Sequence, residues 1–278
     1  MGRGDYESRA LLSALPFAGH FVILTRMEFA LWVYPVLFFT GLAAGLVDSI
    51  AGGGGLIALP VLLMLGLPVP VALGTNKFQS TCGTLSATRH YVRSGLVDFH
   101  SCRLGILATF VGAVLGVLTV QHTDSHLLGR LIPWLLALIF VYTVFRPHVG
   151  AQDHPPRVKE SLFFTVFGLG LGFYDGFFGP GVGSLWAISL IVVLGQNFAK
   201  ATAYTKVMNL SSNVASIALF AYAGMLHLNA GIAMGTGQII GARLGSGLVV
   251  RKGARFIRPI FLTIVGLTLA RLLWVNYR

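Results

Sequence analysis

Charged side chains are scarce in this sequence. Asp, Glu, Lys and Arg make up 10% of its 278 residues, and only nine residues are acidic. Ordinary globular proteins are about 25% charged, so a water-soluble domain is excluded. Cysteine is rarer still, since Cys82 and Cys102 are the two in the chain and lie in or beside apolar segments. Two such cysteines give neither a disulfide framework nor a metal-ligand cluster, and no metal or cofactor is expected.

Signatures of common enzymes are also missing. The chain has no His-Glu-x-x-His and no Gly-x-Ser-x-Gly, which disfavours the hydrolases that carry those motifs. The glycines at 52–55 are not followed by Gly-Lys-Ser/Thr, so they form no Walker loop, and no strand precedes them, as a dinucleotide fingerprint requires. We therefore expect a protein that is not an enzyme.

Long apolar runs dominate what is present. The chain is 55% hydrophobic and its mean hydropathy is +0.78. The apolar runs cover residues 29–47, 55–67, 73–92, 104–120, 127–145, 161–178, 182–195, 203–223, 228–250 and 256–275. Most are long enough to cross a hydrocarbon core, which takes about 20 helical residues. The sequence predicts an all-α integral membrane protein that crosses the bilayer many times.

The net charge of +11 comes from basic residues that lie mainly between these runs. Basic loops are typical of membrane proteins, because such loops stay on the cytoplasmic side. This interpretation is favoured over nucleic-acid binding, which needs a basic patch gathered on one face. No nucleic-acid partner is expected.

The first 26 residues are considered separately. Two arginines and the apolar run 10–24 resemble the charged and hydrophobic regions of a signal peptide, but no small-x-small cleavage site follows. Met27 directly precedes the first strong span and is an alternative start. We divide the chain into an N-terminal extension and two membrane repeats, with the boundaries 1–26, 27–150 and 151–278.

A glycine-rich stretch with a central aspartate occurs twice. Residues 41–54 (GLAAGLVDSIAGGG) and 168–181 (GLGLGFYDGFFGPG) share six of fourteen positions, namely four glycines, a leucine and the aspartate. Further matches follow at a spacing of 129 residues, at which Lys77 corresponds to Lys206. Glycine-broken apolar segments that carry an ionisable residue in both halves of a chain indicate the binding site of a secondary transporter.

Each half holds about five apolar runs, and an odd number of spans would turn the second half upside down. The runs 55–67 and 182–195 directly follow the glycine breaks and are short, which predicts half-helices or re-entrant segments. The loop after the third run carries three arginines, whereas its counterpart at 222–229 carries no Lys or Arg. The loop after the ninth run is basic, whereas its counterpart at 121–130 has one arginine. This opposite polarity predicts two inverted five-segment repeats.

Lys77 and Lys206 each open an apolar run behind polar residues, Thr75-Asn76 and Tyr204-Thr205. An ammonium beside the free amides of a helix N-terminus suits an anion. We expect both lysines to contact an anion, with hydrogen-bond donors supplied by Asn76, Thr205, Ser80 and Asn209. Two alternatives stay open: the lysines snorkel to the membrane interface, and the polar residues serve helix packing.

Asp48 and Asp175 lie at equivalent points of the two glycine-rich stretches. Three roles are open to them: they relay protons, they act as counter-ions of Lys206 and Lys77, or they cap the helix that follows. The glycines around them are expected to break the helices and to let backbones approach closely. The glycines meant are Gly52, Gly54, Gly179 and Gly181.

Arg243 lies inside the ninth run, and its repeat counterpart is Val114. An arginine so far inside a span predicts a second anion contact or a pair with one aspartate. The flanking Gly241 and Gly245 form a small-xxx-small stripe, which is compatible with a homodimer or with a partner complex.

These motifs together resemble the sulfite exporter TauE/SafE family, also called the toluene sulfonate uptake permeases, and within it the branch of YfcA-like probable membrane transporters. The segments that carry the resemblance are 48–55 (DSIAGGGG), 75–77 (TNK), 172–181 (GFYDGFFGPG), 199–203 (AKATA), Lys206 and 241–246 (GARLGS). The resemblance runs from about residue 27 to about 275. It implies a permease of the bacterial inner membrane whose substrates are small sulfur-containing or organic anions.

We therefore expect a secondary transporter that moves a small anion, such as sulfite or sulfoacetate, by alternating access. The expected partners are that anion and the lipid bilayer. A passive anion channel and a membrane scaffold without transport are the alternatives; channel conductance or a stable hetero-complex would identify them.

Overall fold

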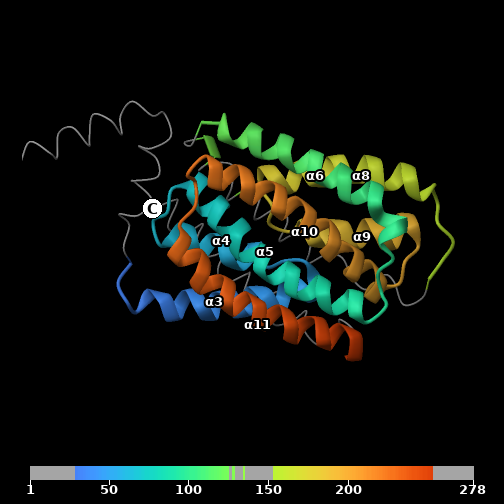
Figure 1. The fold of residues 1–278 in the computed structure, drawn as a ribbon, viewed down its shortest axis with the longest axis horizontal. Coiled ribbons are helices and arrows are strands. Elements are labelled where there is room, and N and C mark those ends of the chain that lie inside the picture. The colour runs from blue at the N-terminus through green and yellow to red at the C-terminus, as the bar shows by residue number, and fades with distance from the viewer. Residues whose placement is uncertain (1–28, 125–126, 129–133, 135–152, 253–278) are drawn as a thin grey trace, which may run out of the picture.

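The computed structural model describes residues 29–124, 127–128, 134 and 153–252. In this part of the chain the structure contains helices and no strand, which confirms the all-α prediction (Figure 1). The helices are α3 (Val33–Ala51), α4 (Gly55–Met64), α5 (Val69–Arg93), α6 (Phe99–Gln121), α8 (Glu160–Phe177), α9 (Val182–Leu194), α10 (Phe198–Tyr222) and α11 (Leu228–Lys252). The extension 1–26, the run 256–275 and most of the run 127–145 lie outside the described residues.

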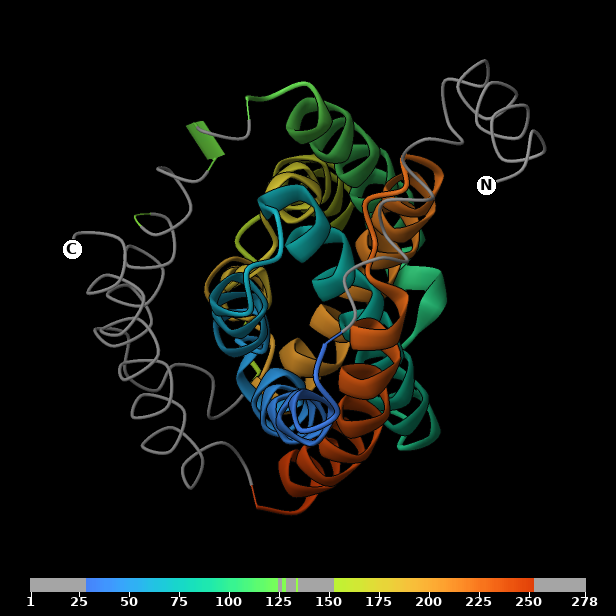
Figure 2. The same cartoon turned by 90° about the vertical axis from the view of Figure 1, so that its left-hand side faces the viewer.

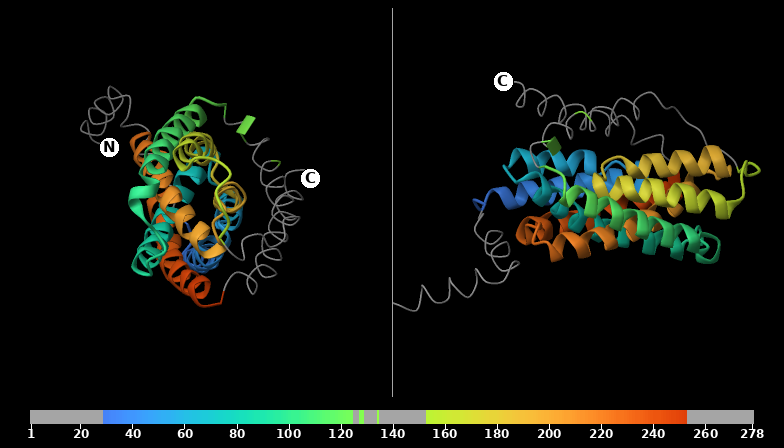
Figure 3. Two further views of the ribbon diagram at one scale, coloured as in Figure 1. Left: turned by 90° about the vertical axis from the view of Figure 1, so that its right-hand side faces the viewer. Right: turned by 90° about the horizontal axis from the view of Figure 1, so that it is seen from above.

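The two halves present the same order of helix lengths. A long helix, a short helix and two long helices form the series α3 to α6 and again the series α8 to α11. The short helices α4 and α9, of 10 and 13 residues, each follow a glycine break. They lie toward opposite ends of the long axis, along which the long helices run (Figures 1 and 3).

Helix starts follow from local sequence signals. Pro68 directly precedes α5 with an extended backbone, as expected of a residue that cannot continue a helix backwards. The side chain of Asp98 accepts a hydrogen bond from the backbone N–H of His100 at 2.9 Å and caps α6. Asn197 caps α10 in the same way, through the backbone N–H of Lys200 at 3.0 Å. These caps satisfy amides that the first turn of a helix leaves free.

The first helix of each half packs against the fourth helix of the other half. Helix α3 packs along α11, and α8 packs along α6 on the opposite side of the bundle (Figure 2). Glycines make both contacts close: a Cβ at Gly41 would lie 2.0 Å from the carbonyl oxygen of Met234, and one at Gly176 would lie 2.2 Å from that of Ala113. Backbones that approach this closely are typical of helix pairs in membranes.

The Gly241/Gly245 stripe is used inside the chain. A Cβ at Gly241 would lie 2.0 Å from the carbonyl oxygen of Leu42, and one at Gly245 would lie 2.5 Å from that of Leu46, both on α3. The stripe that was compatible with a homodimer is therefore already covered by α3 and is not open to a second copy.

Polarity is inverted relative to a water-soluble protein. Phe39, Leu107 and Val166 expose 65%, 64% and 57% of their surface, whereas Lys206 and Asp175 expose 0% and 3%. Apolar groups outside and ionisable groups inside are expected where the surroundings are lipid. Helix α3 over Val33–Ile50 and α6 over Phe99–Gln121 are long and apolar enough to cross a membrane by length and composition.

Candidate functional site

The two glycine breaks meet in the middle of the bundle. A Cβ at Gly52 would lie 2.3 Å from the carbonyl carbon of Gly183, and one at Gly55 would lie 3.1 Å from the Cα of Pro180. Gly52 and Gly179 also have φ values of 73° and 94°, in the left-handed region that favours glycine. The breaks therefore contact each other backbone to backbone, and a side chain at Gly52 would push them apart.

The first ion pair joins Lys77 of α5 to Asp175 of α8. The Lys77 ammonium donates to Oδ1 of Asp175, and the two side chains are 3% and 4% exposed. The other carboxylate oxygen, Oδ2, accepts a hydrogen bond from the hydroxyl of Ser212 on α10. The Lys77 ammonium also lies 3.4 Å from Oδ1 of Asn213. The opposite charges of Lys77 and Asp175 thus neutralise each other in the interior. The additional contacts with Ser212 and Asn213 compensate for the burial of the pair.

The second ion pair joins Lys206 of α10 to Asp48 of α3. Nζ of Lys206 lies 2.8 Å from Oδ2 of Asp48, and the side chains are 0% and 10% exposed. Oδ1 of Asp48 accepts a weaker hydrogen bond, 3.3 Å long, from the backbone N–H of Gly54 just before α4. Asp48 is therefore the counter-ion of Lys206 and also contacts the residue that precedes α4.

The two pairs are reciprocal. Each lysine contacts the aspartate of the other half, so that Lys77 pairs with Asp175 and Lys206 with Asp48. Both lysines are held across the chain rather than by their own repeat. The ion pairs thus tie the two halves together at the glycine breaks.

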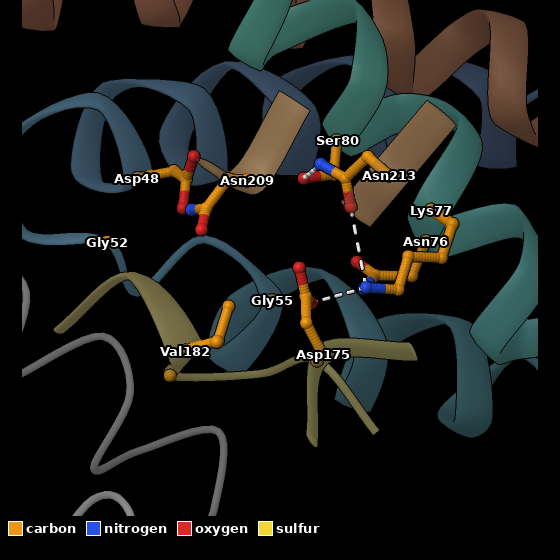
Figure 4. A pocket seen from close by; sticks show the side chains of 12 residues that line it. Asp48, Gly52, Gly55, Asn76, Lys77, Ser80, Asp175, Val182, Asn209 and Asn213 are labelled. Carbon is orange, nitrogen blue, oxygen red and sulfur yellow. Dashed lines mark hydrogen bonds and ion pairs between the residues drawn. The ribbon is translucent and has the colours of Figure 1, made fainter. Parts of the chain in front are cut away.

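A polar pocket opens between the ion pairs (Figure 4). Its lining residues are Asp48, Gly52, Gly55, Asn76, Lys77, Ser80, Asp175, Gly179, Gly181, Val182, Asn209 and Asn213. Lys77 faces this pocket, whereas Lys206 is not among the lining residues. An anion in the pocket would meet one ammonium together with the amide and hydroxyl groups of α5 and α10.

Asparagine side chains give the pocket its neutral polar surface. Nδ2 of Asn213 donates to the hydroxyl of Ser80 at 3.1 Å, so that α10 and α5 are bridged beside Lys77. Oδ1 of Asn76 accepts from the amide of Gln79 at 2.9 Å. Oδ1 of Asn209 is buried without a hydrogen-bond partner among the described residues. A buried polar atom that faces a pocket without a partner is suited to a ligand or to water.

Most of the residues expected at the site line this pocket, and three lie just behind or beside it. Lys206 and Gly54 reach the pocket only through their contacts with Asp48. Thr205 is buried, and its hydroxyl donates to the backbone carbonyl of Ala201 at 2.8 Å. Thr205 is thus used within its own helix, as threonines often are in membrane helices.

Neither lysine lies at a helix N-terminus, contrary to the expectation. Helix α5 begins at Val69 and α10 at Phe198, so Lys77 and Lys206 lie about two turns inside their helices. The polar residues before each lysine are helical and do not form a start signal. The amides around each lysine are therefore engaged in the helix, and the positive charge of the site comes from the ammonium groups.

Arg243 is not brought to the pocket. Its side chain is exposed on α11, and its guanidinium contacts Nδ1 of His90 on α5. The reason is geometric: Gly241 and Gly245 turn one face of α11 toward α3, and a residue two positions along a helix points away from that face. Among the described residues, Arg243 therefore pairs with neither aspartate and does not line the pocket.

Two residues of the site were not among those expected to bind or couple. Asn213 lines the pocket, and Ser212 holds Asp175. The signal for Asn213 was helical spacing, because Lys206, Asn209 and Asn213 follow one another at intervals of three and four residues on one face of α10. The contact of Ser212 depends on how α8 lies against α10, which spacing alone does not give.

Within the described ranges, no group of three His, Cys, Asp or Glu side chains is arranged to hold a metal ion. The charged side chains that line the pocket are those of Lys77, Asp48 and Asp175, and Lys206 contacts Asp48 from behind the pocket. The arrangement is thus suited to holding and releasing a small charged molecule.

Comparisons with known proteins agree with this description. The family model "Sulfite exporter TauE/SafE" matches residues 37–272. A "Probable membrane transporter protein" of Haemophilus influenzae is 41% identical over 234 residues, which cover 84% of this chain and 92% of that protein. The "Probable membrane transporter protein YfcA" of Escherichia coli K12 is 40% identical over 242 residues, 87% of this chain and 90% of that protein. No solved structure matches the chain.

Proposed function

Because the chain belongs to the TauE/SafE sulfite exporter family, we propose that it is a secondary transporter of the bacterial inner membrane that moves a small anion. The proposed cargo is a sulfur oxyanion or an organosulfonate, such as sulfite or sulfoacetate. The observation that carries the proposal is the buried Lys77 ammonium, which faces a polar pocket at the junction of two broken helices. Broken helices that converge on an ionisable residue are typical of transporter sites.

The pocket suits an oxyanion because it offers charge and hydrogen bonds without bulk water. The Lys77 ammonium supplies the charge, and Asn76, Ser80 and Asn213 surround it with amide and hydroxyl groups. A buried ammonium binds an oxyanion strongly because charge-assisted hydrogen bonds are about twice as strong as neutral ones. Asn209 adds a polar side chain on the facing wall.

The proposed architecture is a pair of inverted five-segment repeats. Three observations support it: the helix lengths recur in the same order, the first and fourth helices exchange partners reciprocally, and α4 and α9 lie toward opposite ends of the long axis. The opposite loop charges of the two halves agree with such an inversion. In this arrangement α4 and α9 enter the membrane from opposite faces and stop near its middle.

The glycine breaks provide the proposed means of alternating access. Helices α3 and α11 form one closely packed pair, and α6 and α8 form another. Pairs held by close backbone contact move as rigid units more readily than they separate, because packed helices shift against one another as bodies. We expect the pairs to rock about the contact between Gly52 and Gly183, which opens the pocket to each side in turn.

Transport by reconstituted protein tests this function. Purified protein in liposomes is expected to take up radiolabelled sulfite or sulfoacetate and to show counterflow, in which unlabelled anion on one side accelerates labelled anion from the other. Lys77→Ala is expected to abolish this uptake, since no other ammonium lines the described pocket. Lys200→Ala is the matched control, because Lys200 lies partly exposed in the first turn of α10 and outside the pocket.

The outcomes separate the alternatives. Uptake that survives Lys77→Ala would contradict the site. Unitary currents in a planar bilayer, without counterflow, would identify a passive channel in place of a carrier. Absence of uptake for every anion tested, with folded protein, would favour a scaffold.

A further inference from the structure

The charges at the pocket cancel. Lys77 and Lys206 contribute two positive charges, and Asp175 and Asp48 contribute two negative ones. The four groups are nearly fully buried, so water screens any excess charge poorly. A monoanion that entered alone would leave one uncompensated negative charge in the interior, and such a charge is costly. The anion therefore has to bring a positive charge with it or remove a negative one.

Asp175 is the carboxylate that an entering anion would leave without a partner. The anion reaches the Lys77 ammonium from the pocket and competes with Oδ1 of Asp175 for it. Once displaced, Asp175 keeps only the hydroxyl of Ser212, at a site with 3% exposure. A buried carboxylate that loses its cation takes up a proton instead of staying charged.

Asp48 is in a different position. Its cation is Lys206, which does not line the pocket, and its second oxygen accepts from the backbone N–H of Gly54. An anion bound at Lys77 leaves both contacts in place. The ion pair of Asp48 with Lys206 can therefore stay in place throughout.

Building on the proposed anion transport, we propose that Asp175 is a proton-binding site, and that one proton enters it each time an anion displaces it from Lys77. The carboxylate gains the proton and becomes a neutral carboxylic acid, while the ammonium of Lys77 keeps its charge and donates to the anion. When the anion leaves, the proton leaves as well and the ion pair forms again. A monoanion and a proton thus cross together, without net movement of charge.

Among the residues that the structure describes, few other groups near Asp175 could take this proton. Lys77 approaches from α5, Tyr174 precedes Asp175 on α8, and Asp48 faces it across the pocket from α3. The hydroxyl of Tyr174 is engaged with the backbone carbonyl of Pro180 at 2.8 Å. From α10 come Ser212 and, on the Asp48 side, Lys206. Helix α9 has no titratable residue, and α6 meets this part of α8 through Ala113.

Proton uptake on binding tests this inference directly. Purified full-length protein in detergent and weak buffer is mixed with methanesulfonate, while a pH indicator reports protons removed from solution. Methanesulfonate is the anion of a strong acid and carries no proton near neutral pH, so the protons counted are bound by the protein. Thermal stabilisation in the same samples measures binding independently. Sulfite is tested in parallel, with its own protonation subtracted from a titration in buffer.

The expected result is about one proton per anion bound, as the exchange of one ion-pair partner requires. Asp175→Asn is expected to bind the anion without proton uptake, because the anion then has no carboxylate to displace from Lys77. Asp98→Asn is the matched control, because asparagine preserves the α6 cap and Asp98 lies outside the pocket. In liposomes, a potassium diffusion potential should leave wild-type uptake of a monoanion unchanged.

The outcomes distinguish this inference from the function on which it rests. If neither anion stabilises the wild-type protein, the proposed anion site falls and the proton site falls with it. Anion binding without proton uptake by the wild-type protein overturns the proton site alone. That measurement needs no variant and so decides the matter even where Asp175→Asn fails to fold. Full proton uptake by a folded Asp175→Asn would place the proton elsewhere and also overturn the inference.

Discussion

The two ion pairs are built from the same residues at equivalent places, yet their surroundings differ. Lys77 lines the pocket, whereas Lys206 is fully buried behind Asp48. Asp175 is held by the hydroxyl of Ser212, but the repeat counterpart of Ser212 is Gly83, which has no hydroxyl to offer Asp48. The backbone N–H of Gly54 takes that place. Different neighbours thus give the two copies different uses. The Lys77–Asp175 pair is open, because an anion can replace the carboxylate, and the Lys206–Asp48 pair is closed.

Mutation of the closed pair, Lys206–Asp48, should lower the stability of the folded protein most. Lys206→Ala leaves the carboxylate of Asp48 buried with only a long backbone hydrogen bond. Removing one partner of a buried pair costs about 3–5 kcal/mol, so we expect a large drop in the unfolding temperature in detergent. Lys77→Ala is expected to cost less, because Asp175 keeps the hydrogen bond from the hydroxyl of Ser212. The double variant Lys206→Ala/Asp48→Asn should recover part of the loss; equal losses for both lysines would contradict the distinction.

The next largest effect is expected from disrupting the backbone contact between the two glycine breaks. Gly52→Ala places a side chain at a positive φ, and the added Cβ would lie 2.3 Å from the carbonyl carbon of Gly183. We therefore expect this variant to prevent the two breaks from packing and to abolish transport. Gly66→Ala is the matched control, since Gly66 has a φ of 83° but no atom within 4 Å of an added Cβ. It carries the conformational cost alone, about 1–2 kcal/mol. Comparable losses of uptake in the two variants would show that strain matters and contact does not.

Access to the open pair can be altered from Gly179. An added Cβ there would lie 3.0 Å from both Oδ1 of Asp175 and Nζ of Lys77, and would cover the pair from the pocket. We expect Gly179→Ala to reduce anion affinity more than 10-fold, which corresponds to about 1.4 kcal/mol. Gly95→Ala, at a φ of 71° with open space around it, controls for strain. Anion titrations followed by thermal stabilisation measure both, and unchanged affinity for Gly179→Ala would contradict the approach from this side.

The smallest effect is expected from changing a neighbour of the open pair that its repeat counterpart lacks. Asn213→Thr gives α10 the residue that its repeat counterpart, Thr84, has on α5. The variant loses the contacts with Lys77 and Ser80, each worth about 0.5–1.5 kcal/mol, so affinity should fall a few-fold while folding is kept. Val214→Thr, at an exposed position next to it, is the control. Concentration dependence of uptake separates affinity from maximal rate, and a change in rate alone would argue against binding by Asn213.

Local features of the sequence predicted what is local in the fold. Apolar runs predicted helices, and the glycines between 52 and 55 and between 179 and 181 coincide with the ends of α3 and α8 and the starts of α4 and α9. The sequence misplaced Lys77 and Lys206 at helix starts because the apolar runs begin later than the helices. Pro68 and Asn197 marked the true starts.

Contacts between distant segments were harder to predict. The sequence left three roles open for Asp48 and Asp175, because spacing along the chain does not say which side chains meet across it. Arg243 was assigned to the interior from its depth within an apolar run, whereas the glycine stripe of α11 turns it outward. Periodicity of the glycines on α3 and α11 carried that information, but only when the two helices are considered as a packed pair.

The exchange of packing partners between the halves also bears on how the protein is made. Helix α3 is synthesised early, but α11, which its glycines contact, is the last described helix to leave the ribosome. The first half therefore enters the membrane with its closest backbone contacts unmade. Because such long-range contacts form late and slowly, the first half has to stay inserted and unaggregated until translation is nearly complete. Assembly in the bilayer thus depends on the whole chain and does not proceed one half at a time.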